Sequence, residues 1–222
     1  ENPKAFDVMH VCVPFRISNF IGETARYIEL FKPQVTVLNS TVAVGTTREL
    51  AERTGAAVVN SPVRGKHVRM AADLLHYRKF VGAMDRDTAD VVSRHFEAAG
   101  MKTAVLGSPE TTEAAKLTET TYFGLMIAWA QEVERYCDLW GIKYDEVVSI
   151  YDEVPFFPPV KYFPGVIGGH CAMSNIEILG QAVSSEILKA IEESNRQKVE
   201  RERRRPAEPA KRSKKHRASA AR

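Results

Sequence analysis

The chain has 222 residues, and 44% of them are hydrophobic, which is enough to bury a core of one or two domains. It contains no run of about 18 apolar residues and begins with polar residues, so we expect neither a membrane span nor a signal peptide. Three cysteines without CxxC spacing and six scattered histidines argue against a disulfide framework and a metal site, and we expect a reduced, cytoplasmic protein.

The net charge of +3 conceals a strong asymmetry. Residues 196–222 contain twelve Lys or Arg and three Glu, a balance of +9, which leaves −6 for the rest of the chain. We expect residues 200–222 to form a basic, disordered tail. The simpler role for such a tail is solubility, and the alternative is weak contact with nucleic acid or another polyanion.

Short apolar stretches alternate with helical ones in the first half of the chain. This alternation is typical of a parallel α/β sheet, and we assign residues 1–108 to a partial Rossmann-like domain. Ligands of such sheets bind beyond the carboxyl ends of the strands. The predicted strands cover residues 8–14, 35–38, 56–59, 79–84 and 102–106, and the predicted helices cover 22–31, 48–53 and 87–99.

The second half of the chain is predicted to be helical. A long helix over residues 109–140 carries apolar side chains around most of its circumference, so it should be buried on several sides, against its own domain or a second subunit. We therefore expect a homodimer through this helix. A short helix over 145–151, an aromatic, proline-rich loop over 155–164 and a last helix from 176 to about 199 complete a helical dimerisation domain, residues 109–199.

A glycine turn, Gly168-Gly169-His170-Cys171, places a cysteine just before the last helix. Backbone N–H groups and the helix dipole at such a position favour the thiolate, which is the reactive form of cysteine. The alternative is an inert thiol packed in a core. Two further segments accompany the turn. One begins Asn39-Ser40-Thr41 and runs to Thr47, and the other is Glu113-Ala114-Ala115-Lys116-Leu117.

In this order and at this spacing, the three segments resemble the UDP-glucose/GDP-mannose dehydrogenase family, over most of residues 8–180. The resemblance implies NAD-dependent oxidation of a nucleotide sugar, from the C6 alcohol through an aldehyde to a carboxylate, with a thiohemiacetal and a thioester on the cysteine. The Gly-Gly-His-Cys string is closer to family members that act on N-acetylated sugars than to those that act on UDP-glucose.

The resemblance also implies roles for single residues. It makes Cys171 the nucleophile and Lys116 the group that stabilises negative charge on oxygen, and it places Thr41 near the nicotinamide and the reacting water. A plain surface lysine is the alternative for Lys116, and an ordinary helix cap is the alternative for Ser40 and Thr41. The cofactor-binding residues that the resemblance implies are Val13, Pro14, Ser40 and Thr41.

Three positions depart from the family pattern. Val63 stands where the family has a glutamate after its Ser-Pro pair, Thr120 where it has an asparagine, and Asn175 where it has an aspartate. Thr120 and Asn175 remain candidates for the catalytic site, since each can orient a neighbouring group. Without the glutamate, no evident base is left to activate water on a thioester.

A basic segment, Arg64-Gly65-Lys66-His67, directly follows Val63. Arg64 offers a bidentate fork to a phosphate or carboxylate, and His67 is a candidate acid or base near neutral pH. The alternative is a basic surface loop. The predicted substrate-binding residues are Arg64, Lys66, His67, Gly168, Gly169 and His170, which would form a positively charged pocket with Lys116 and Cys171 for an anionic substrate.

No GxGxxG sequence occurs, and the chain starts at what resembles the fourth strand of the family's first domain. NAD is therefore expected to bind only if that segment is present, and the family's third domain has no counterpart either. Two alternatives to a divergent nucleotide-sugar dehydrogenase stay open. One is an enzyme on the same scaffold that stops at an aldehyde, and the other is a non-catalytic protein that binds a nucleotide sugar or serves in assembly.

Overall fold

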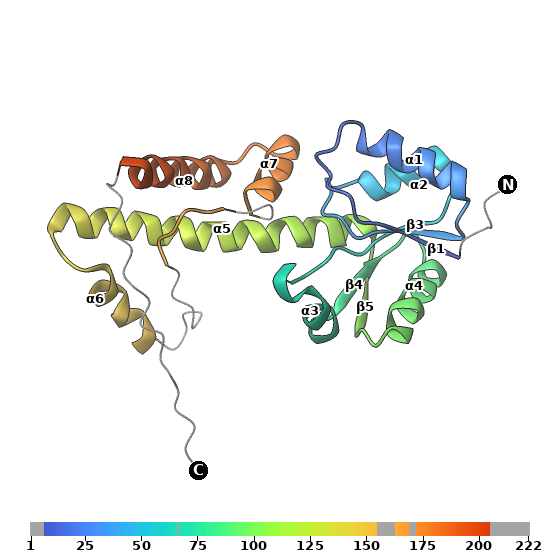
Figure 1. The fold of residues 1–222 in the computed structure, drawn as a ribbon, viewed down its shortest axis with the longest axis horizontal. Helices are drawn as coiled ribbons and strands as arrows, with labels where there is room; N and C mark the ends of the chain where they lie inside the picture. Colours follow the sequence, from blue (N-terminus) through green and yellow to red (C-terminus); the bar gives the residue numbers. More distant parts are fainter. Residues whose placement is uncertain (1–6, 66, 155–162, 169–171, 205–222) are drawn as a thin grey trace, which may run out of the picture.

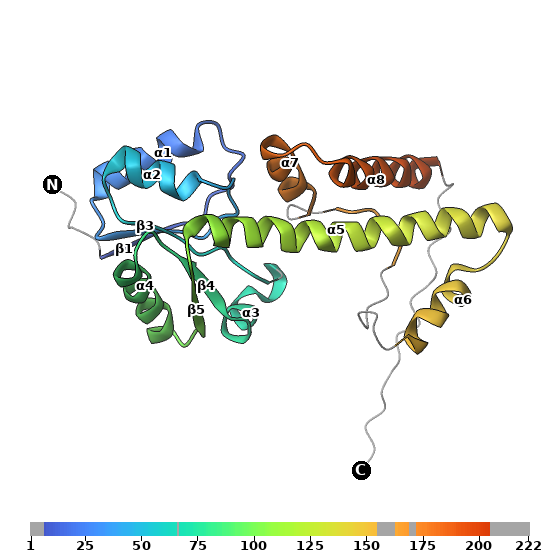
Figure 2. The ribbon, with the colours of Figure 1, turned by 180° about the vertical axis from the view of Figure 1, so that it is seen from behind.

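The structure is a computed structural model that describes residues 7–65, 67–154, 163–168 and 172–204. Figures 1 and 2 show two parts, a sheet with helices on both of its faces and an elongated helical part built along one long helix, α5.

Five strands form the sheet, in the order β1-β2-β3-β4-β5. The first three, β1 (Val8–Val11), β2 (Val35–Leu38) and β3 (Val58–Asn60), run parallel to one another. The last two, β4 (Lys79–Gly82) and β5 (Thr103–Leu106), run parallel to each other but antiparallel to β3. The sheet is therefore mixed, with parallel pairs dominating.

The expectation of a wholly parallel sheet is wrong at the junction of β3 and β4. The connection between these strands holds a 3-10 turn, η1 (His67–Arg69), and the short helix α3 (Met70–His76), neither of which was predicted. A parallel neighbour would need a crossover that returns the chain to the opposite edge of the sheet. Here the chain re-enters at the edge it has just left, so β4 starts beside the carboxyl end of β3.

Helices cover both faces of the sheet (Figure 1). On one face, α1 (Phe20–Phe31) and α2 (Thr46–Thr54) pack over side chains such as Leu38 and Val58. On the other face, α4 (Arg86–Ala98) packs over Val37, Val59 and Val81. Successive side chains of a strand point to opposite faces, so strands covered on both sides are apolar throughout, as the short apolar runs of the sequence indicated.

The long helix α5 (Pro109–Trp140) has the bounds that the sequence predicts. Ser108 caps its first turn, proline occupies the first helical position, and Gly141 ends it in the left-handed conformation at φ 66°. α5 leads from the sheet to the far end of the molecule, where α6 (Tyr144–Ser149) and a 3-10 segment, η2 (Ile150–Glu153), follow it (Figure 2).

The predicted last helix is in fact two helices, α7 (Ala172–Ala182) and α8 (Glu186–Arg204), which both pack against α5. The chain leaves the helical conformation at residues 183–185. The hydroxyl of Ser185 then accepts a hydrogen bond from the Leu188 N–H, so it supports the first turn of α8 as a cap does. α8 also continues to Arg204 instead of ending near residue 199.

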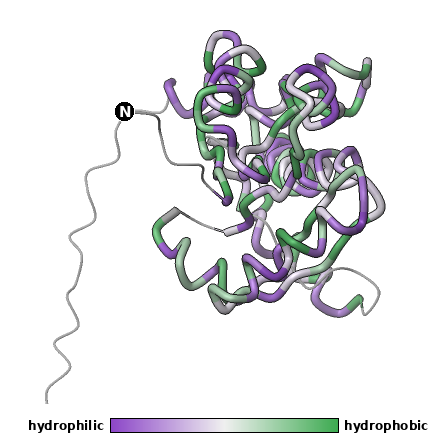
Figure 3. Tube along the Cα trace, turned by 90° about the vertical axis from the view of Figure 1, so that its right-hand side faces the viewer, coloured by the Kyte–Doolittle hydropathy of each residue, from purple (hydrophilic) through white to green (hydrophobic). Residues whose placement is uncertain are grey.

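α5 is buried on one side only within this chain, although its sequence predicts burial on several. A cluster of buried side chains joins it to α7 and α8. Three large aromatic side chains elsewhere on α5 are about half exposed, with Tyr122 at 53%, Phe123 at 48% and Trp129 at 50%. Polar and apolar stretches alternate along the helices in Figure 3, as this one-sided packing requires. No helix among the described residues is long and apolar enough to cross a membrane.

Candidate active site

A pocket of about 400 Å³ lies where the carboxyl ends of the parallel strands meet α5 and α7. Loops that follow the first three strands form one wall, and side chains of the two helices form the other. The pocket brings together residues that are far apart in the sequence. Six predicted site residues line it: Val13, Pro14, Ser40, Thr41, Lys116 and Asn175.

Ser40 joins the ends of the first two strands. Its hydroxyl donates a hydrogen bond to the carbonyl of Val13, at 2.5 Å. The helix α2 begins only at Thr46, with Gly45 as its N-cap residue and no side-chain cap bond. The alternative of an ordinary helix cap at Ser40 and Thr41 is therefore wrong, and both side chains remain at the wall of the pocket.

Glu113, in the first turns of α5, takes the place of that missing cap. Its side chain is buried, and its carboxylate accepts hydrogen bonds from the Gly45 N–H (2.7 Å), the Thr47 N–H (2.9 Å) and the Thr47 hydroxyl (2.5 Å). Burial raises the pKa of Glu113, and the three donors oppose that rise. Because Lys116 lies one turn further along α5, this contact also sets the loop of Thr41 against Lys116. The sequence motif contains Glu113, but its spacing alone does not reveal a partner on another helix.

Asn175 and Thr120, the two helix positions that depart from the family pattern, are in contact with each other. The Asn175 amide donates to the Thr120 hydroxyl at 2.7 Å, and this hydroxyl lies 3.0 Å from the Lys116 carbonyl and 3.1 Å from that of Leu117. Thr120 does not line the pocket but holds Asn175, which does. The pair is neutral, so it can orient a ligand but cannot accept a proton at neutral pH.

Arg64 is engaged with its own protein. Its guanidinium forms an ion pair with Glu119 on α5, at 2.6 Å, and lies 5.5 Å from the ring centres of both Tyr77 and Phe80. It lines a second pocket of about 270 Å³, and Lys116 lines both pockets. An anionic ligand would have to replace Glu119 to use the fork of Arg64.

The other predicted substrate-binding residues are only partly visible. Gly168 is described, is exposed and is not among the residues that line the pocket. Gly65 lines the pocket at φ 134°, a backbone conformation that favours glycine. Lys66, Gly169, His170 and Cys171 lie outside the described residues, and only the backbone of His67 is described.

A buried lysine that the sequence analysis does not single out lies beside the pocket. Lys79 opens β4 with a side chain that is 4% exposed as a residue, and its Nζ donates to Asn39 Oδ1 at 2.9 Å and to the Ser61 carbonyl at 2.5 Å. Burial lowers the pKa of Lys79 to about 7; Cys12 opposes this shift and Lys116 adds to it. The only signal in the sequence is a lysine at the start of a short apolar strand.

Asn39 extends this contact toward the surface. Its Nδ2 lies 3.1 Å from Nδ1 of His10 and 3.3 Å from the Val37 carbonyl. The Nε2 atoms of His10 and His95 are 2.9 Å apart. Burial lowers the pKa of His10, and His95 and Lys79 lower it further. A polar chain of four side chains thus links the inside of the sheet to the helix α4.

A dinucleotide cofactor needs free backbone amides for its diphosphate. The helices after the first two strands do not offer them, since Asn19 accepts the Gly22 N–H at the start of α1 and Glu113 fills the start of α2. The described residues therefore do not fit a whole NAD molecule. The wall from Val13 to Thr41 suits its nicotinamide end at most. In the parts that the structure describes, no three His, Cys, Asp or Glu side chains come together as metal ligands.

Comparison with known proteins places these features in a family. The profile of the UDP-glucose/GDP-mannose dehydrogenase family, central domain, matches residues 110–197. The chain is 27% identical over 185 residues to the UDP-N-acetyl-D-mannosamine dehydrogenase of Methanocaldococcus jannaschii, covering 76% of this chain and 43% of that protein. It is 26% identical over 172 residues to the NDP-N-acetyl-D-galactosaminuronic acid dehydrogenase of Ralstonia nicotianae, covering 69% of this chain and 40% of that protein.

Solved structures show the same fold. The UDP-D-ManNAc dehydrogenase of Pyrococcus horikoshii superposes with a TM-score of 0.75 at 19% identity, over 86% of this chain and 50% of that one. The chain spans less than half the length of the two curated relatives.

Proposed function

Because this chain is a divergent and partial member of the UDP-glucose/GDP-mannose dehydrogenase family, we propose that it takes part in the NAD-dependent oxidation of a nucleotide sugar at C6. The observation that supports this function is the convergence of Thr41, Lys116 and Asn175 in one pocket. We take the sugar to be N-acetylated, since the names of both curated relatives carry that group. A reduced thiol is needed, so we place the reaction in the cytoplasm.

The covalent chemistry belongs to Cys171. Its thiolate attacks the aldehyde carbon, a C–S bond forms, and the carbonyl electron pair moves onto oxygen as a thiohemiacetal. Lys116 stabilises the negative charge on that oxygen, and Asn175, held by Thr120, orients the sugar. The described residues offer no diphosphate site for NAD, so these steps are the ones that the chain's own side chains perform.

One observation favours a shorter reaction. Neither aspartate nor glutamate is among the described residues that line the pocket, and Val63 occupies the position of the family glutamate. Release of a carboxylate from a thioester requires an activated water, for which no carboxylate base is present. A second candidate function is therefore an oxidation that stops at the aldehyde, and a third is the binding of a nucleotide sugar without a redox step.

Production of NADH from UDP-N-acetyl-D-mannosamine tests the proposal. We expect Cys171→Ser to abolish turnover and Lys116→Ala to lower it by about 100-fold, the loss seen when a single oxyanion donor is removed. Cys12→Ser is the matched thiol control. Unchanged NADH production by Cys171→Ser would contradict the assignment. Binding of the nucleotide sugar by calorimetry without any NADH from the wild type would favour the non-redox alternative.

We also propose that the exposed face of α5 binds a second copy of the chain. Trp129, Tyr122 and Phe123 expose about half of their surface on one helix, an apolar area that a partner helix would cover. Trp129→Glu should then give a monomer in sedimentation at micromolar concentration. Tyr27→Glu, at an aromatic residue of α1 with 43% exposure, is the control that should leave the dimer intact. A monomeric wild type would overturn this proposal.

A further inference from the structure

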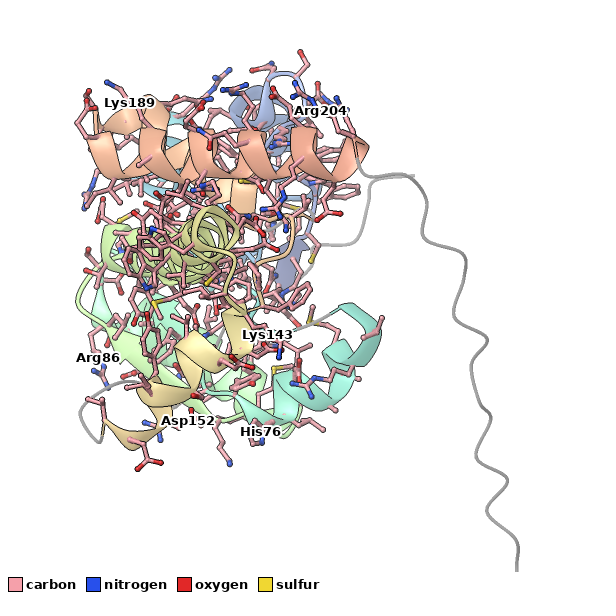
Figure 4. The ribbon with its side chains drawn as sticks, turned by 90° about the vertical axis from the view of Figure 1, so that its left-hand side faces the viewer. His76, Arg86, Lys143, Asp152, Lys189 and Arg204 are labelled. Carbon is pink, nitrogen blue, oxygen red and sulfur yellow. The ribbon has the colours of Figure 1, made fainter. Side chains whose placement is uncertain are left out.

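A buried polar network lies between α5, α8 and the segment 163–168. Figure 4 shows α8 lying across one side of α5, with Lys189 and Arg204 near its two ends. Three side chains of these helices form the network. Gln131 has no exposed surface, and Ser194 and Asn195 are each 8% exposed. Polar side chains this deeply buried need hydrogen-bond partners, and the identity of those partners shows what the network holds.

Asn195 holds the backbone of a single residue from both sides. Its Oδ1 accepts the Ile167 N–H at 2.7 Å, and its Nδ2 donates to the Ile167 carbonyl at 3.0 Å. One side-chain amide thus replaces the two bonds that a neighbouring strand would make. Gln131 adds a third bond, from its Nε2 to the Gly165 carbonyl at 2.7 Å. The chain is fixed here by directional bonds in addition to apolar packing.

Ser194, the neighbour of Asn195, has different partners. Its hydroxyl lies 2.8 Å from Gln131 Oε1 and 3.3 Å from the Ala128 carbonyl, both on α5. Arg135, also on α5, donates to it at 3.0 Å. Ser194 therefore joins α8 to α5, whereas Asn195 joins α8 to the segment that contains Ile167. The two adjacent residues have equal burial and separate tasks.

The held segment leads directly into the cysteine turn. Ile167 is 3% exposed and Ala172, the first residue of α7, is 5% exposed, and both belong to the same buried cluster. Residues 168–171 connect these two anchors. A stretch of four residues with both ends fixed has far fewer conformations than one with a free end, so the anchor at Ile167 restricts where Cys171 can lie.

We propose that Asn195, supported by Gln131, is a positioning residue that holds the Cys171 thiol in its reactive place before α7. This inference rests on the proposed function, since it concerns the thiol that we assign as the nucleophile. Asn195 makes no contact with the pocket, so its effect passes through the backbone of Ile167. An apolar side chain would fill the same space but would leave the Ile167 N–H and carbonyl without partners.

The test measures the reactivity of Cys171 separately from turnover. The intact chain is alkylated with iodoacetamide across a range of pH, and the rate at each cysteine is followed by peptide mass spectrometry. Cys12, which is exposed on the other side of the pocket, is the internal reference. The variants are Asn195→Ala and the matched control Ser194→Ala. Asn195→Ser covers the case in which Asn195→Ala does not fold.

We expect the midpoint of the Cys171 profile to lie below the ~8.5 of a free thiol in the wild type and to move toward that value in Asn195→Ala. The rate at pH 7 then falls about tenfold for each unit of movement. Ser194→Ala should leave the profile of Cys171 unchanged, and no variant should change that of Cys12.

Two results overturn the positioning role alone: an unchanged Cys171 midpoint in both Asn195 variants, or an equal movement in Ser194→Ala. A different result tells against the proposed function itself. If the wild-type midpoint already lies at the value of a free thiol, Cys171 is not activated, and the nucleophile and its positioning residue fall together.

Discussion

Removal of the Glu113 carboxylate should destabilise the fold far more than removal of a neighbouring carboxylate on the same turn. Glu113→Ala leaves the Gly45 N–H, the Thr47 N–H and the Thr47 hydroxyl without their acceptor. A buried donor without a partner costs about 1–3 kcal/mol, but the three bonds share one carboxylate whose burial is itself unfavourable. We therefore expect a loss of about 3 kcal/mol rather than the sum of three separate bonds.

Glu110 is the matched control, because it also joins the start of α5 to α2. Its carboxylate pairs with Arg48 at 2.6 Å, but the two side chains are 27% and 49% exposed. Ion pairs at the surface contribute at most about 1 kcal/mol, so Glu110→Ala should cost less than that. Urea unfolding of both variants, with the slope against denaturant unchanged, measures the difference. Equal losses in the two variants would refute the capping role of Glu113.

The pH dependence of the same contact has a definite sign. Burial raises the pKa of Glu113 above its ordinary value of 4.5, so the folded state binds this proton more tightly than the unfolded state does. The stability that the proton contributes is complete below pH 4.5 and is lost as pH rises through the folded pKa. The difference in unfolding free energy between the wild type and Glu113→Gln should therefore grow in favour of the wild type as pH falls from 7. A difference independent of pH would contradict this.

Three further predictions use other contacts. The pKa of Lys79 is lowered to about 7 in the folded protein, so the unfolding free energy of the wild type should rise with pH from about 7 toward the ordinary value of 10.5, and Lys79→Met should remove this slope in urea unfolding at a series of pH values. A double-mutant cycle of Thr120→Val and Asn175→Ala should give a coupling of about 1 kcal/mol, and a coupling near zero would remove the hydrogen bond from the account. Gly65→Ala should cost about 2 kcal/mol or more in thermal unfolding, since its Cβ would meet Asp73 Cβ at 2.5 Å with φ at 134°; a loss below about 0.5 kcal/mol would show that the loop shifts freely.

Local signals in the sequence predict much of the fold. The long helix has the bounds that Ser108, Pro109 and Gly141 indicate, because caps act on the residues next to them. The direction of β4 could not be predicted in this way, since it depends on where the chain runs after β3 and not on the strand's own residues. The break before α8 lacks a glycine or proline, and only Ser185 marks it.

The candidate site follows the same division. Residues at strand ends and on one helix face meet as expected, since parallel strands end at one edge and residues three or four apart share a face. The partner of Arg64 could not be foreseen, because Glu119 lies 55 positions away and becomes a neighbour only through packing against α5. The same is true of Glu113, whose donors lie 66 and 68 positions away, at the start of another helix.

The polar chain from Lys79 to His95 also determines where single protons lie. Lys79 has only donors, so Asn39 must turn its oxygen toward Lys79 and its NH₂ toward His10. Nδ1 of His10 then has to accept, which leaves the ring proton on Nε2, and the facing Nε2 of His95 must accept in turn. The interior lysine thus selects the tautomers of two imidazoles, and nitrogen NMR of the rings should find opposite tautomers at His10 and His95.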